Sequence, residues 1–193
     1  MKKIAIFASG SGSNAQKIIE YFNEKPVAKV DIVLTNKRDA FVLERARNFH
    51  ITSVTFNRDE LYNSDVISNL LCDRQIDLIV LAGFLWLVPA NILRMFPNRI
   101  INIHPALLPG YGGKGMFGRR VHEAVIDNRE IFSGITIHHI NERYDEGDVI
   151  FQAKCKVEIT DDAHSLEEKI HALEHMHYPR VVEEVIMKLD AKS

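Results

Sequence analysis

The stretch KIAIFASGSGSNAQKIIEYF, residues 3–22, decides the fold. Residues 3–8 are a short apolar run with the length and composition of a buried strand. Residues 14–22 carry apolar side chains at helical spacing, and residues 9–13 between them contain two glycines and three serines. A buried strand followed by a glycine-containing turn and a helix predicts the first unit of an α/β fold.

The same alternation continues through the first hundred residues. Apolar runs rich in β-branched residues predict strands at residues 30–35, 51–56, 78–82 and 100–104, and helical spacing predicts helices at residues 41–49, 65–74 and 89–95. Strands that alternate with helices form a parallel sheet with right-handed crossovers and helices on both faces. Because such sheets bind ligands at the carboxyl ends of their strands, we expect the site there.

The residues after 104 predict a different arrangement of elements. A glycine-rich loop at residues 105–118 precedes a predicted helix at 119–127, and strands at 134–140 and 149–154 are expected to pair as a hairpin. Ser165 and Glu168 match a capping box, so a last helix is expected to begin at Ser165, with Pro179 kinking or restarting it. The predicted fold class is α/β, doubly wound, with a mostly parallel sheet and an antiparallel C-terminal part.

Length and charge are those of an ordinary globular protein. The 193 residues are close to the size of one domain, so residues 1–193 are expected to form a single domain. The 24 basic and 26 acidic side chains leave a net charge of −2, which offers no basic surface to nucleic acid. No apolar run spans a bilayer and no signal peptide is present, so we expect a cytoplasmic protein without a membrane partner.

Cys72 and Cys155 lack C-x-x-C spacing and are expected to be buried free thiols.

The turn at residues 9–14 has the features of an anion-binding site. Ser13 and Gln16 are spaced as a capping box, which predicts exposed backbone N–H groups at a helix N-terminus. The third glycine of a dinucleotide-binding motif and the lysine of a Walker loop are absent, and Thr35 and Asn36 stand where an acidic ribose ligand is usual. These differences favour a single phosphomonoester. A tight turn that binds no ligand is the alternative.

Asn102 and His104 form a polar pair at the end of a predicted strand. The two-residue period of a strand places them on one face, and Pro105 ends the strand. A protonated histidine and a carboxamide can both donate hydrogen bonds to a developing oxyanion, as acyl-type transfer requires. A histidine that is hydrogen-bonded for structural reasons alone is the alternative.

The acidic segment NERYDEGD, residues 141–148, follows a predicted strand. A carboxylate that turned towards His104 would stabilise the protonated imidazole. Spacing alone leaves four candidates open, which are Glu142, Asp145, Glu146 and Asp148.

His171, Glu174 and His175 match the H-x-x-E-H pattern of a zinc site. Such a site needs a third protein ligand from elsewhere, and the residues after His175 lie on what is predicted to be the same helix. We therefore expect no metal, which leaves surface histidines and a ligand-binding role for Glu174 as the alternatives. His138 and His139 are neighbours on a strand, so they face opposite sides and make a poor metal pair.

These motifs together resemble one family, the phosphoribosylglycinamide formyltransferases, which are folate-dependent enzymes of purine synthesis. The resemblance runs from about Lys3 to Val185 and implies a Rossmann-like formyltransferase fold. The Asn-x-His-Pro element alone would indicate only the wider formyltransferase superfamily. The matching motifs are residues 9–14 (SGSGSN), 35–37 (TNK), 81–84 (LAGF), 102–105 (NIHP), 107–109 (LLP) and 144–147 (YDEG).

The resemblance implies that 10-formyltetrahydrofolate, as co-substrate, donates a formyl group to the primary amine of glycinamide ribonucleotide. It implies a catalytic trio of Asn102, His104 and Asp145, and no metal. Residues 1–100 are the implied phosphate-binding half, and residues 101–193 the catalytic and folate-binding half. The implied ligands of the substrate's phosphate and ribose are Gly12, Ser13, Asn14 and Glu174. The implied folate ligands are Arg58, Leu85, Trp86, Leu87, Val88, Asn141, Glu142, Arg143 and Tyr144.

The sequence departs from the family's pattern at several positions. Ala106 stands where a serine is more usual, and Trp86 stands where a basic residue is frequent. Glu146 and Asp148 replace a glycine and a proline, and the loop at residues 110–118 differs from the commonest form. The resemblance implies small-molecule partners and a monomer or homodimer.

Three other functions share parts of the pattern. A methionyl-tRNA formyltransferase would need an RNA-binding domain and a basic surface, and a formyltetrahydrofolate deformylase would need an additional N-terminal domain. We expect neither from this sequence. A non-catalytic nucleotide-binding module is the alternative from a different class.

Overall fold

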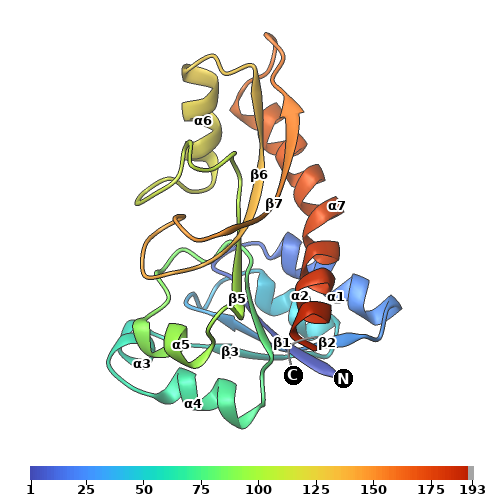
Figure 1. The fold of residues 1–193 in the computed structure, drawn as a ribbon, viewed down its shortest axis with the longest axis vertical. Helices are drawn as coiled ribbons and strands as arrows, with labels where there is room; N and C mark the ends of the chain where they lie inside the picture. The colour runs from blue at the N-terminus through green and yellow to red at the C-terminus, as the bar shows by residue number, and fades with distance from the viewer. Residues whose placement is uncertain (191–193) are drawn as a thin grey trace.

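Within residues 1–190, seven strands form one sheet in the order β3-β2-β1-β4-β5-β6-β7 (Figure 1). The structure is a computed structural model that describes residues 1–190. The strands are β1 (Lys2–Phe7), β2 (Ala28–Thr35), β3 (Thr52–Thr55), β4 (Leu78–Leu81), β5 (Ile100–His104), β6 (Phe132–His139) and β7 (Val149–Lys156). The chain moves outward from β1 to β3 and then crosses to β4 on the other side of β1, which is the strand order of a doubly wound sheet.

The first five strands are parallel and the last two are antiparallel. β1 pairs with β2 and β4, and β4 pairs with β5, all in parallel, whereas β6 runs antiparallel to both β5 and β7. The predicted fold class is therefore confirmed, including its antiparallel C-terminal part. The register between β5 and β6 places Asn102 opposite His138, and His104 opposite Thr136.

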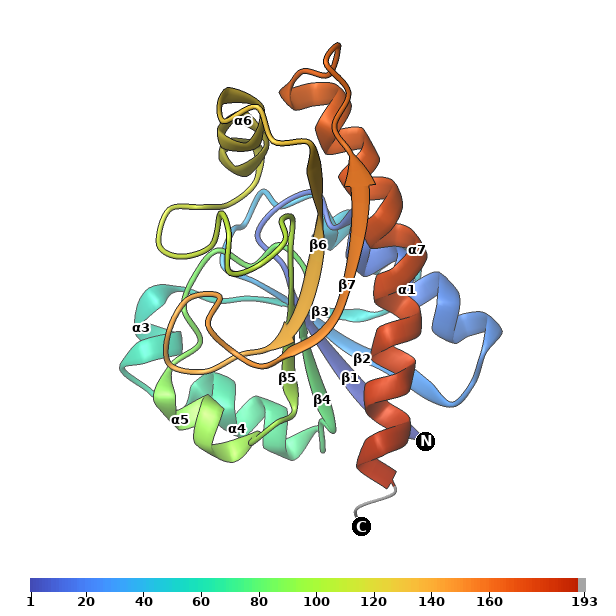
Figure 2. The ribbon, with the colours of Figure 1, turned by 45° about the horizontal axis from the view of Figure 1, so that its top comes forward.

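Helices cover both faces of the sheet. One face carries α1 (Ser13–Glu24), α2 (Val42–Asn48), α6 (Arg119–Asp127) and α7 (Ala163–Asp190), and the other carries α3 (Arg58–Tyr62), α4 (Val66–Asp73) and α5 (Ala90–Met95). Figure 2 shows the long helix α7 running beside β6 and β7, away from α3, α4 and α5. Within residues 1–190, no helix combines the length and the apolar character needed to cross a membrane.

The two faces of the central strands belong to two separate apolar cores. On β1, Ile4 and Ile6 pack with α1 and α7, whereas Ala5 and Phe7 pack with the helices of the other face. All four side chains are buried, because a parallel sheet between two helical layers has no face towards water. This double burial explains the continuous apolar runs in the sequence.

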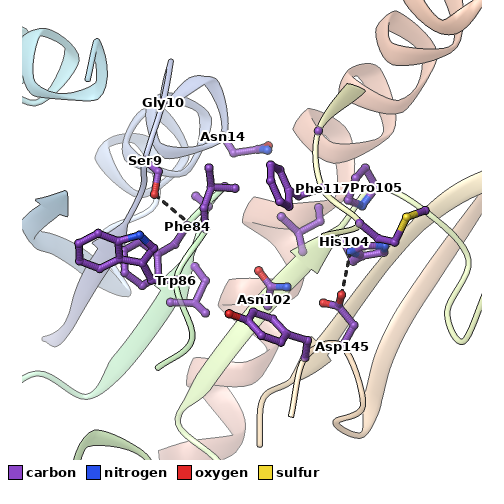
Figure 3. Close-up of a pocket in the computed structure, with 18 of the residues that line it drawn as sticks. Ser9, Gly10, Asn14, Phe84, Trp86, Asn102, His104, Pro105, Phe117 and Asp145 are labelled. Atoms are coloured by element: carbon purple, nitrogen blue, oxygen red, sulfur yellow. Dashed lines mark hydrogen bonds and ion pairs between the residues drawn. The ribbon is translucent and has the colours of Figure 1, made fainter. Parts of the chain in front are cut away.

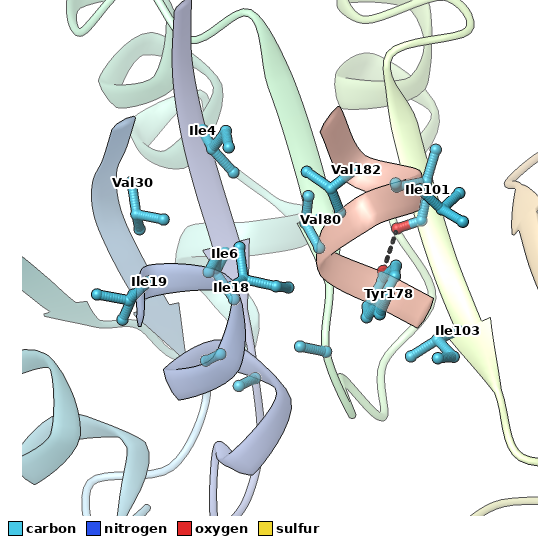
Figure 4. Packing of buried hydrophobic residues seen from close by; sticks show 14 of the residues in the cluster. Ile4, Ile6, Ile18, Ile19, Val30, Val80, Ile101, Ile103, Tyr178 and Val182 are labelled. Carbon is cyan, nitrogen blue, oxygen red and sulfur yellow. Dashed lines mark hydrogen bonds between the residues drawn. The ribbon is translucent and has the colours of Figure 1, made fainter. Parts of the chain in front are cut away.

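Tyr178 connects α7 to β5 and to the carboxyl end of β4 (Figure 4). Its side chain is fully buried, and its hydroxyl donates a hydrogen bond of 2.9 Å to the carbonyl oxygen of Leu81 and lies 3.4 Å from that of Ile101. Burial raises the pKa of Tyr178 well above its usual value, so the hydroxyl remains a donor. Glu174, one turn earlier on α7, is thereby held at the same end of the sheet.

The start of α7 differs from the prediction. The carboxylate of Asp162 accepts hydrogen bonds from the backbone N–H groups of His164 (2.9 Å) and Ser165 (2.8 Å), so α7 begins at Ala163. The predicted capping box of Ser165 and Glu168 is therefore wrong. The helix then continues through Pro179 without a restart.

Two other local predictions need correction. No helix was predicted at α3, where Asn57 and Glu60 form a capping box: Asn57 Oδ1 accepts from Glu60 N (3.0 Å), and Glu60 Oε2 accepts from Asn57 N (2.7 Å). Cys72 and Cys155 are free thiols as predicted, but Cys72 is exposed and Cys155 is only half-buried. Cys72 lies on α4, beside the buried Leu71.

Gly134 in β6 allows the close approach of β7, so Gly134→Ala should destabilise the fold. The added Cβ would lie 2.0 Å from the carbonyl oxygen of Ala153 and 2.8 Å from Cδ2 of Leu107. Such overpacking costs about 1–3 kcal/mol of unfolding free energy, measurable by urea denaturation. Gly10→Ala is the control, because nothing lies within 4 Å of its Cβ. Equal unfolding midpoints for the two variants would contradict this account.

Candidate active site

The carboxyl ends of β1, β4 and β5 open into a cavity of about 630 Å³ (Figure 3). The loops after β1 and β4, the loop between β5 and α6, the segment between β6 and β7, and part of α7 line this cavity. Apart from Arg58 and Glu142, every residue predicted for the site lines it. The site therefore lies where the strand order of the sheet predicts it.

His104 is the last residue of β5 and is almost fully buried, with 3% of its surface exposed. Its Nδ1 lies 3.5 Å from Oδ2 of Asp145, and its Nε2 lies 2.7 Å from the carbonyl oxygen of Tyr111. Both ring nitrogens thus face acceptors. Asp145 and the backbone of Tyr111 therefore fix the orientation of the imidazole ring at the end of β5.

Asp145 is the carboxylate of the acidic segment that turns inward. It is half-buried, whereas the other three candidate carboxylates of residues 141–148 are exposed. Its Oδ2 faces His104 and accepts a hydrogen bond from Gly113 N (3.0 Å), and its Oδ1 lies 3.7 Å from Nε2 of His138. Asp145 has a φ of +55°, a left-handed conformation that aspartate tolerates better than most residues. The structure thus selects one of the four carboxylates that spacing left open.

His138 fixes the orientation of the Asn102 carboxamide across the β5–β6 pair. Its Nδ1 lies 2.8 Å from the carbonyl oxygen of His139, which assigns the ring proton to Nδ1. Its Nε2 then accepts a hydrogen bond from Asn102 Nδ2 at 3.2 Å. Burial lowers the pKa of His138, which keeps the ring neutral and Nε2 an acceptor. The second N–H of Asn102 Nδ2 is left for a ligand.

The turn after β1 leaves the N-terminus of α1 without a side-chain cap. Gly12 is the N-cap residue, and Ser13 is the first residue of the helix, so the predicted capping box of Ser13 and Gln16 is wrong. The free N–H groups and the helix dipole favour an anion. Gly12 has a φ of +73°, and a Cβ there would lie 2.4 Å from Cγ2 of Val42, so the turn requires glycine.

Glu174 lies beside this turn, although it is far away in the sequence. Only 6% of its surface is exposed, and its Oε2 accepts a hydrogen bond of 2.8 Å from Asn14 Nδ2. Burial raises the pKa of the Glu174 carboxyl. Its oxygens lie in the wall of the cavity that also contains the N-terminus of α1, where they can accept hydrogen bonds from ligand hydroxyl or amine groups.

Aromatic side chains form one wall of the cavity around Trp86. The ring centroid of Trp86 lies 6.2 Å from that of Phe56 and 6.4 Å from that of Phe84. Arg58 does not line the cavity, but its guanidinium lies 5.0 Å from the Trp86 ring centroid. Glu142 is exposed and does not line it either. The predicted folate residues that do line it are Leu85, Trp86, Leu87, Val88, Asn141, Arg143 and Tyr144.

The side chains of the H-x-x-E-H pattern on α7 point to different neighbours. His171 and His175 stack with ring centroids 6.0 Å apart and planes 7° apart, while Glu174 turns to Asn14. Among the residues that the structure describes, no group of three or more histidine, cysteine, aspartate or glutamate side chains is arranged to hold a metal ion. His171 is exposed and lines the cavity, and His175 is half-buried.

Several residues of the site were missed from the sequence. His122 on α6 lines the cavity with 2% of its surface exposed, and His138 was considered only as a metal ligand. The position of His138 opposite Asn102 would indicate its role, but that position is known only once β5 and β6 are known to pair. Tyr111 contacts His104 through a backbone carbonyl, so no side-chain pattern could have identified it.

The fold and the site together define the class of the formyl transferases. The family model with the description "Formyl transferase" matches residues 2–182. The phosphoribosylglycinamide formyltransferase of Bacillus subtilis (strain 168) is 34% identical over 191 residues, which are 96% of this chain and 95% of that protein. The chain belongs to the phosphoribosylglycinamide formyltransferase family.

Further relatives and solved structures agree with this assignment. The chloroplastic phosphoribosylglycinamide formyltransferase of Arabidopsis thaliana is 40% identical over 187 residues, which are 94% of this chain and 64% of that protein. The chain covers 60% of the chloroplastic relative from Vigna unguiculata, so it spans about three fifths of these two proteins. The crystal structure of the enzyme from Bacillus Halodurans has a TM-score of 0.86 at 33% identity and covers 97% of both chains. That from Streptococcus pneumoniae TIGR4 has a TM-score of 0.84 at 36% identity, covering 96% of this chain and 99% of that one.

Buried histidines should make the protein less stable in mild acid. Burial lowers the pKa of His122 and His138 below their usual value of 6.5. Below pH 6.5 the unfolded chain therefore binds protons that the folded chain does not bind. The free energy of unfolding should accordingly fall as the pH is lowered through this window, as urea titrations at several pH values would show.

The variant His122→Phe separates this effect from general acid sensitivity. It should lose less stability on acidification than the wild type, by about 1.4 kcal/mol for each unit by which burial lowers the His122 pKa. His164→Gln is the control, because His164 is exposed and its replacement should leave the pH dependence unchanged. A His122→Phe protein with the full wild-type pH dependence would contradict the assignment.

Proposed function

We propose that this chain transfers the formyl group of 10-formyltetrahydrofolate to the amine of glycinamide ribonucleotide, a step of de novo purine biosynthesis. One observation carries the proposal: a single cavity contains both an uncapped helix N-terminus and the group of Asn102, His104 and Asp145. The helix N-terminus can bind the phosphate of a phosphorylated amine. The oxyanion donors can act on the formyl group of an acyl-type donor. The names of the relatives support the same reaction.

The phosphate of the substrate is proposed to bind at the N-terminus of α1. Gly12, Ser13 and Asn14 offer backbone N–H groups there, and Lys37 in the cavity wall adds a positive charge. Glu174, which accepts from Asn14, is proposed to bind the ribose hydroxyls. In this proposal the phosphate binds to residues of the 1–100 half, and the ribose binds to Glu174 on α7.

The folate is proposed to bind between the segment after β4 and the segment between β6 and β7. Leu85, Leu87 and Val88 offer apolar surface and Trp86 an aromatic face, while Asn141, Arg143 and Tyr144 line another part of the cavity. Flat heteroaromatic rings bind well between apolar walls that also carry backbone N–H and C=O groups. Arg58 beside Trp86 and the exposed Glu142 would contact only the part of the folate that leaves the cavity.

The proposed chemistry requires stabilisation of negative charge on the formyl oxygen. When the substrate amine attacks the formyl carbon, the imidazolium of His104 and the free N–H of Asn102 are the donors that meet this charge. Asp145 orients the imidazole and stabilises its charge. The amine nitrogen first bonds to the formyl carbon, and the tetrahedral oxyanion then re-forms its carbonyl as the bond to the folate nitrogen breaks, while Asp145 with water relays the proton from the attacking amine to that nitrogen. Side-chain donors carry this scheme, so it calls for no metal.

Removal of either charged partner should abolish most turnover. His104→Ala removes a donor, and Asp145→Asn removes the charge that holds the imidazolium. Each change should lower kcat for formyl transfer by about a hundredfold or more, in a spectrophotometric assay of tetrahydrofolate-type product. Asp148→Asn, an exposed carboxylate of the same segment, should leave kcat near the wild-type value. Near-full activity of His104→Ala would overturn the assignment.

Glu174→Gln tests the sugar-phosphate side of the cavity. The amide keeps the shape but weakens acceptance from the ribose hydroxyls, so KM for glycinamide ribonucleotide should rise about tenfold while KM for the folate stays unchanged. Glu184→Gln on the outer face of the same helix is the matched control. Equal effects on both KM values would contradict a role specific to one substrate.

The same assay separates the alternative functions. A transferase releases folate product only when glycinamide ribonucleotide is present, a deformylase releases it without the amine, and a binding module releases none. If folate product appeared equally with and without glycinamide ribonucleotide, the reaction would be hydrolysis and the proposed transfer would be wrong.

A further inference from the structure

We propose that Arg45 on α2 is a positioning residue that orients the turn after β1 for the phosphate of the substrate. Its guanidinium holds a peptide unit of this turn from the α2 side, and Arg45 does not itself line the cavity. The inference deepens the proposed function and rests on it for the link to turnover. Neither the relatives' names nor the family resemblance assigns a role to this residue.

The N-terminal end of α2 lies against the turn after β1. Nε of Arg45 donates a hydrogen bond of 2.8 Å to the carbonyl oxygen of Ser11. The backbone N–H of Val42 donates one of 3.2 Å to the carbonyl oxygen of Gly10. The side chain of Val42 also fills the space that a Cβ at Gly12 would need. Two successive carbonyl groups of the turn therefore face α2.

These two carbonyl groups determine where the neighbouring N–H groups point. A trans peptide unit is planar, and its C=O and N–H groups point in opposite directions. The N–H groups of Ser11 and Gly12 therefore point away from α2. Both residues line the cavity, where such N–H groups can donate to a phosphate oxygen. A rotated peptide unit would instead present the carbonyl oxygen of Ser11 to the anion.

Glycine at position 12 makes a restraint on this peptide unit necessary. Rotation of the unit between Ser11 and Gly12 changes the φ of Gly12, and glycine adopts positive and negative φ about equally readily. The turn requires glycine here because Val42 leaves no room for a Cβ, so its own backbone offers little resistance to the rotation. A hydrogen bond from the charged guanidinium to the Ser11 carbonyl supplies that resistance.

The guanidinium of Arg45 is held by two further contacts. Its Nη1 donates to Oε1 of Gln16 on α1, and its central carbon lies 5.0 Å from the centroid of the Phe41 ring. Arg45 therefore connects the turn, the first part of α1 and the start of α2. A lysine could not reproduce these contacts, because an ammonium group lacks the planar fork that reaches two acceptors in fixed directions.

Ribose 5-phosphate is a probe of this role that needs neither folate nor turnover. Arg45→Ala should weaken its binding about tenfold, as expected for the loss of one charge-assisted hydrogen bond, measured as a dissociation constant by isothermal titration calorimetry. Arg47→Ala is the matched control, because it removes the same charge from an exposed side chain of the same helix, and it should bind as tightly as the wild type. Equal dissociation constants for Arg45→Ala and the wild type would overturn the proposal.

The variant Arg45→Lys separates position from charge. It keeps the positive charge but loses the fork, so it should lose most of the affinity for ribose 5-phosphate that Arg45→Ala loses. It also permits the test if Arg45→Ala fails to fold. Wild-type affinity in Arg45→Lys would mean that charge alone acts and would contradict the positioning role, as would an equal loss in Arg47→Ala.

The dependence of turnover on the phosphate is a readout that a general loss of stability would not move. Arg45→Ala should raise KM for glycinamide ribonucleotide about tenfold and leave kcat and KM for the folate near wild type. With glycinamide ribonucleoside, which lacks the phosphate, kcat/KM should be equal in Arg45→Ala and in the wild type. An equal loss of kcat/KM for both substrates would contradict a role in phosphate binding.

The binding and kinetic measurements distinguish failure of this inference from failure of the proposed function. If Arg45→Ala weakens the binding of ribose 5-phosphate but the wild type shows no formyl transfer, the positioning role stands and the proposed function fails. If formyl transfer occurs and Arg45→Ala binds ribose 5-phosphate as tightly as the wild type, the positioning role is wrong. It is also wrong if formyl transfer occurs and the wild type does not bind ribose 5-phosphate.

Discussion

The rest of the structure depends on a buried imidazole held between two acceptors. His104 is almost fully buried, with Asp145 facing one ring nitrogen and a backbone carbonyl facing the other. A buried polar ring is costly unless its nitrogens have partners, so the surrounding segments must keep both partners in place. The acidic segment, the glycine-rich loop and the end of β5 therefore meet at this ring.

The sheet brings these parts together because its strand pairing changes from parallel to antiparallel at β6. Five parallel strands direct their carboxyl ends and following loops to one edge, where the N-terminus of α1 also lies. The antiparallel β6 then places His138 opposite Asn102, which fixes the amide, and leads into the segment that carries Asp145. α7 closes the site from the other side, because Tyr178 binds the carbonyl of Leu81 and holds Glu174 against Asn14. The proposed phosphate site and the proposed oxyanion site therefore share one cavity.

The parts of the molecule that follow from local periodicity were predictable from the sequence. Short apolar runs alternating with helical segments predict the parallel sheet, and residues at strand ends, such as Asn102 and His104, follow from that placement. Helix caps, which depend on competing local contacts, were not predictable. The predicted capping box at Ser13 is wrong because Gly12 is the N-cap of α1, and that at Ser165 is wrong because Asp162 caps α7. Asp145 could be chosen only by resemblance, since its inward direction depends on the backbone of residues 141–148 and on Gly113. His138 and Tyr111 act through register and backbone, which side-chain patterns do not record.

A crystal structure of the complex with glycinamide ribonucleotide and an unreactive analogue of 10-formyltetrahydrofolate tests the central claim most directly. The account predicts the substrate phosphate on the N–H groups at the start of α1, and the analogue's formyl oxygen about 3 Å from both the His104 ring and Asn102 Nδ2. A formyl oxygen beyond hydrogen-bond reach of both side chains, more than about 4 Å from each, would contradict it.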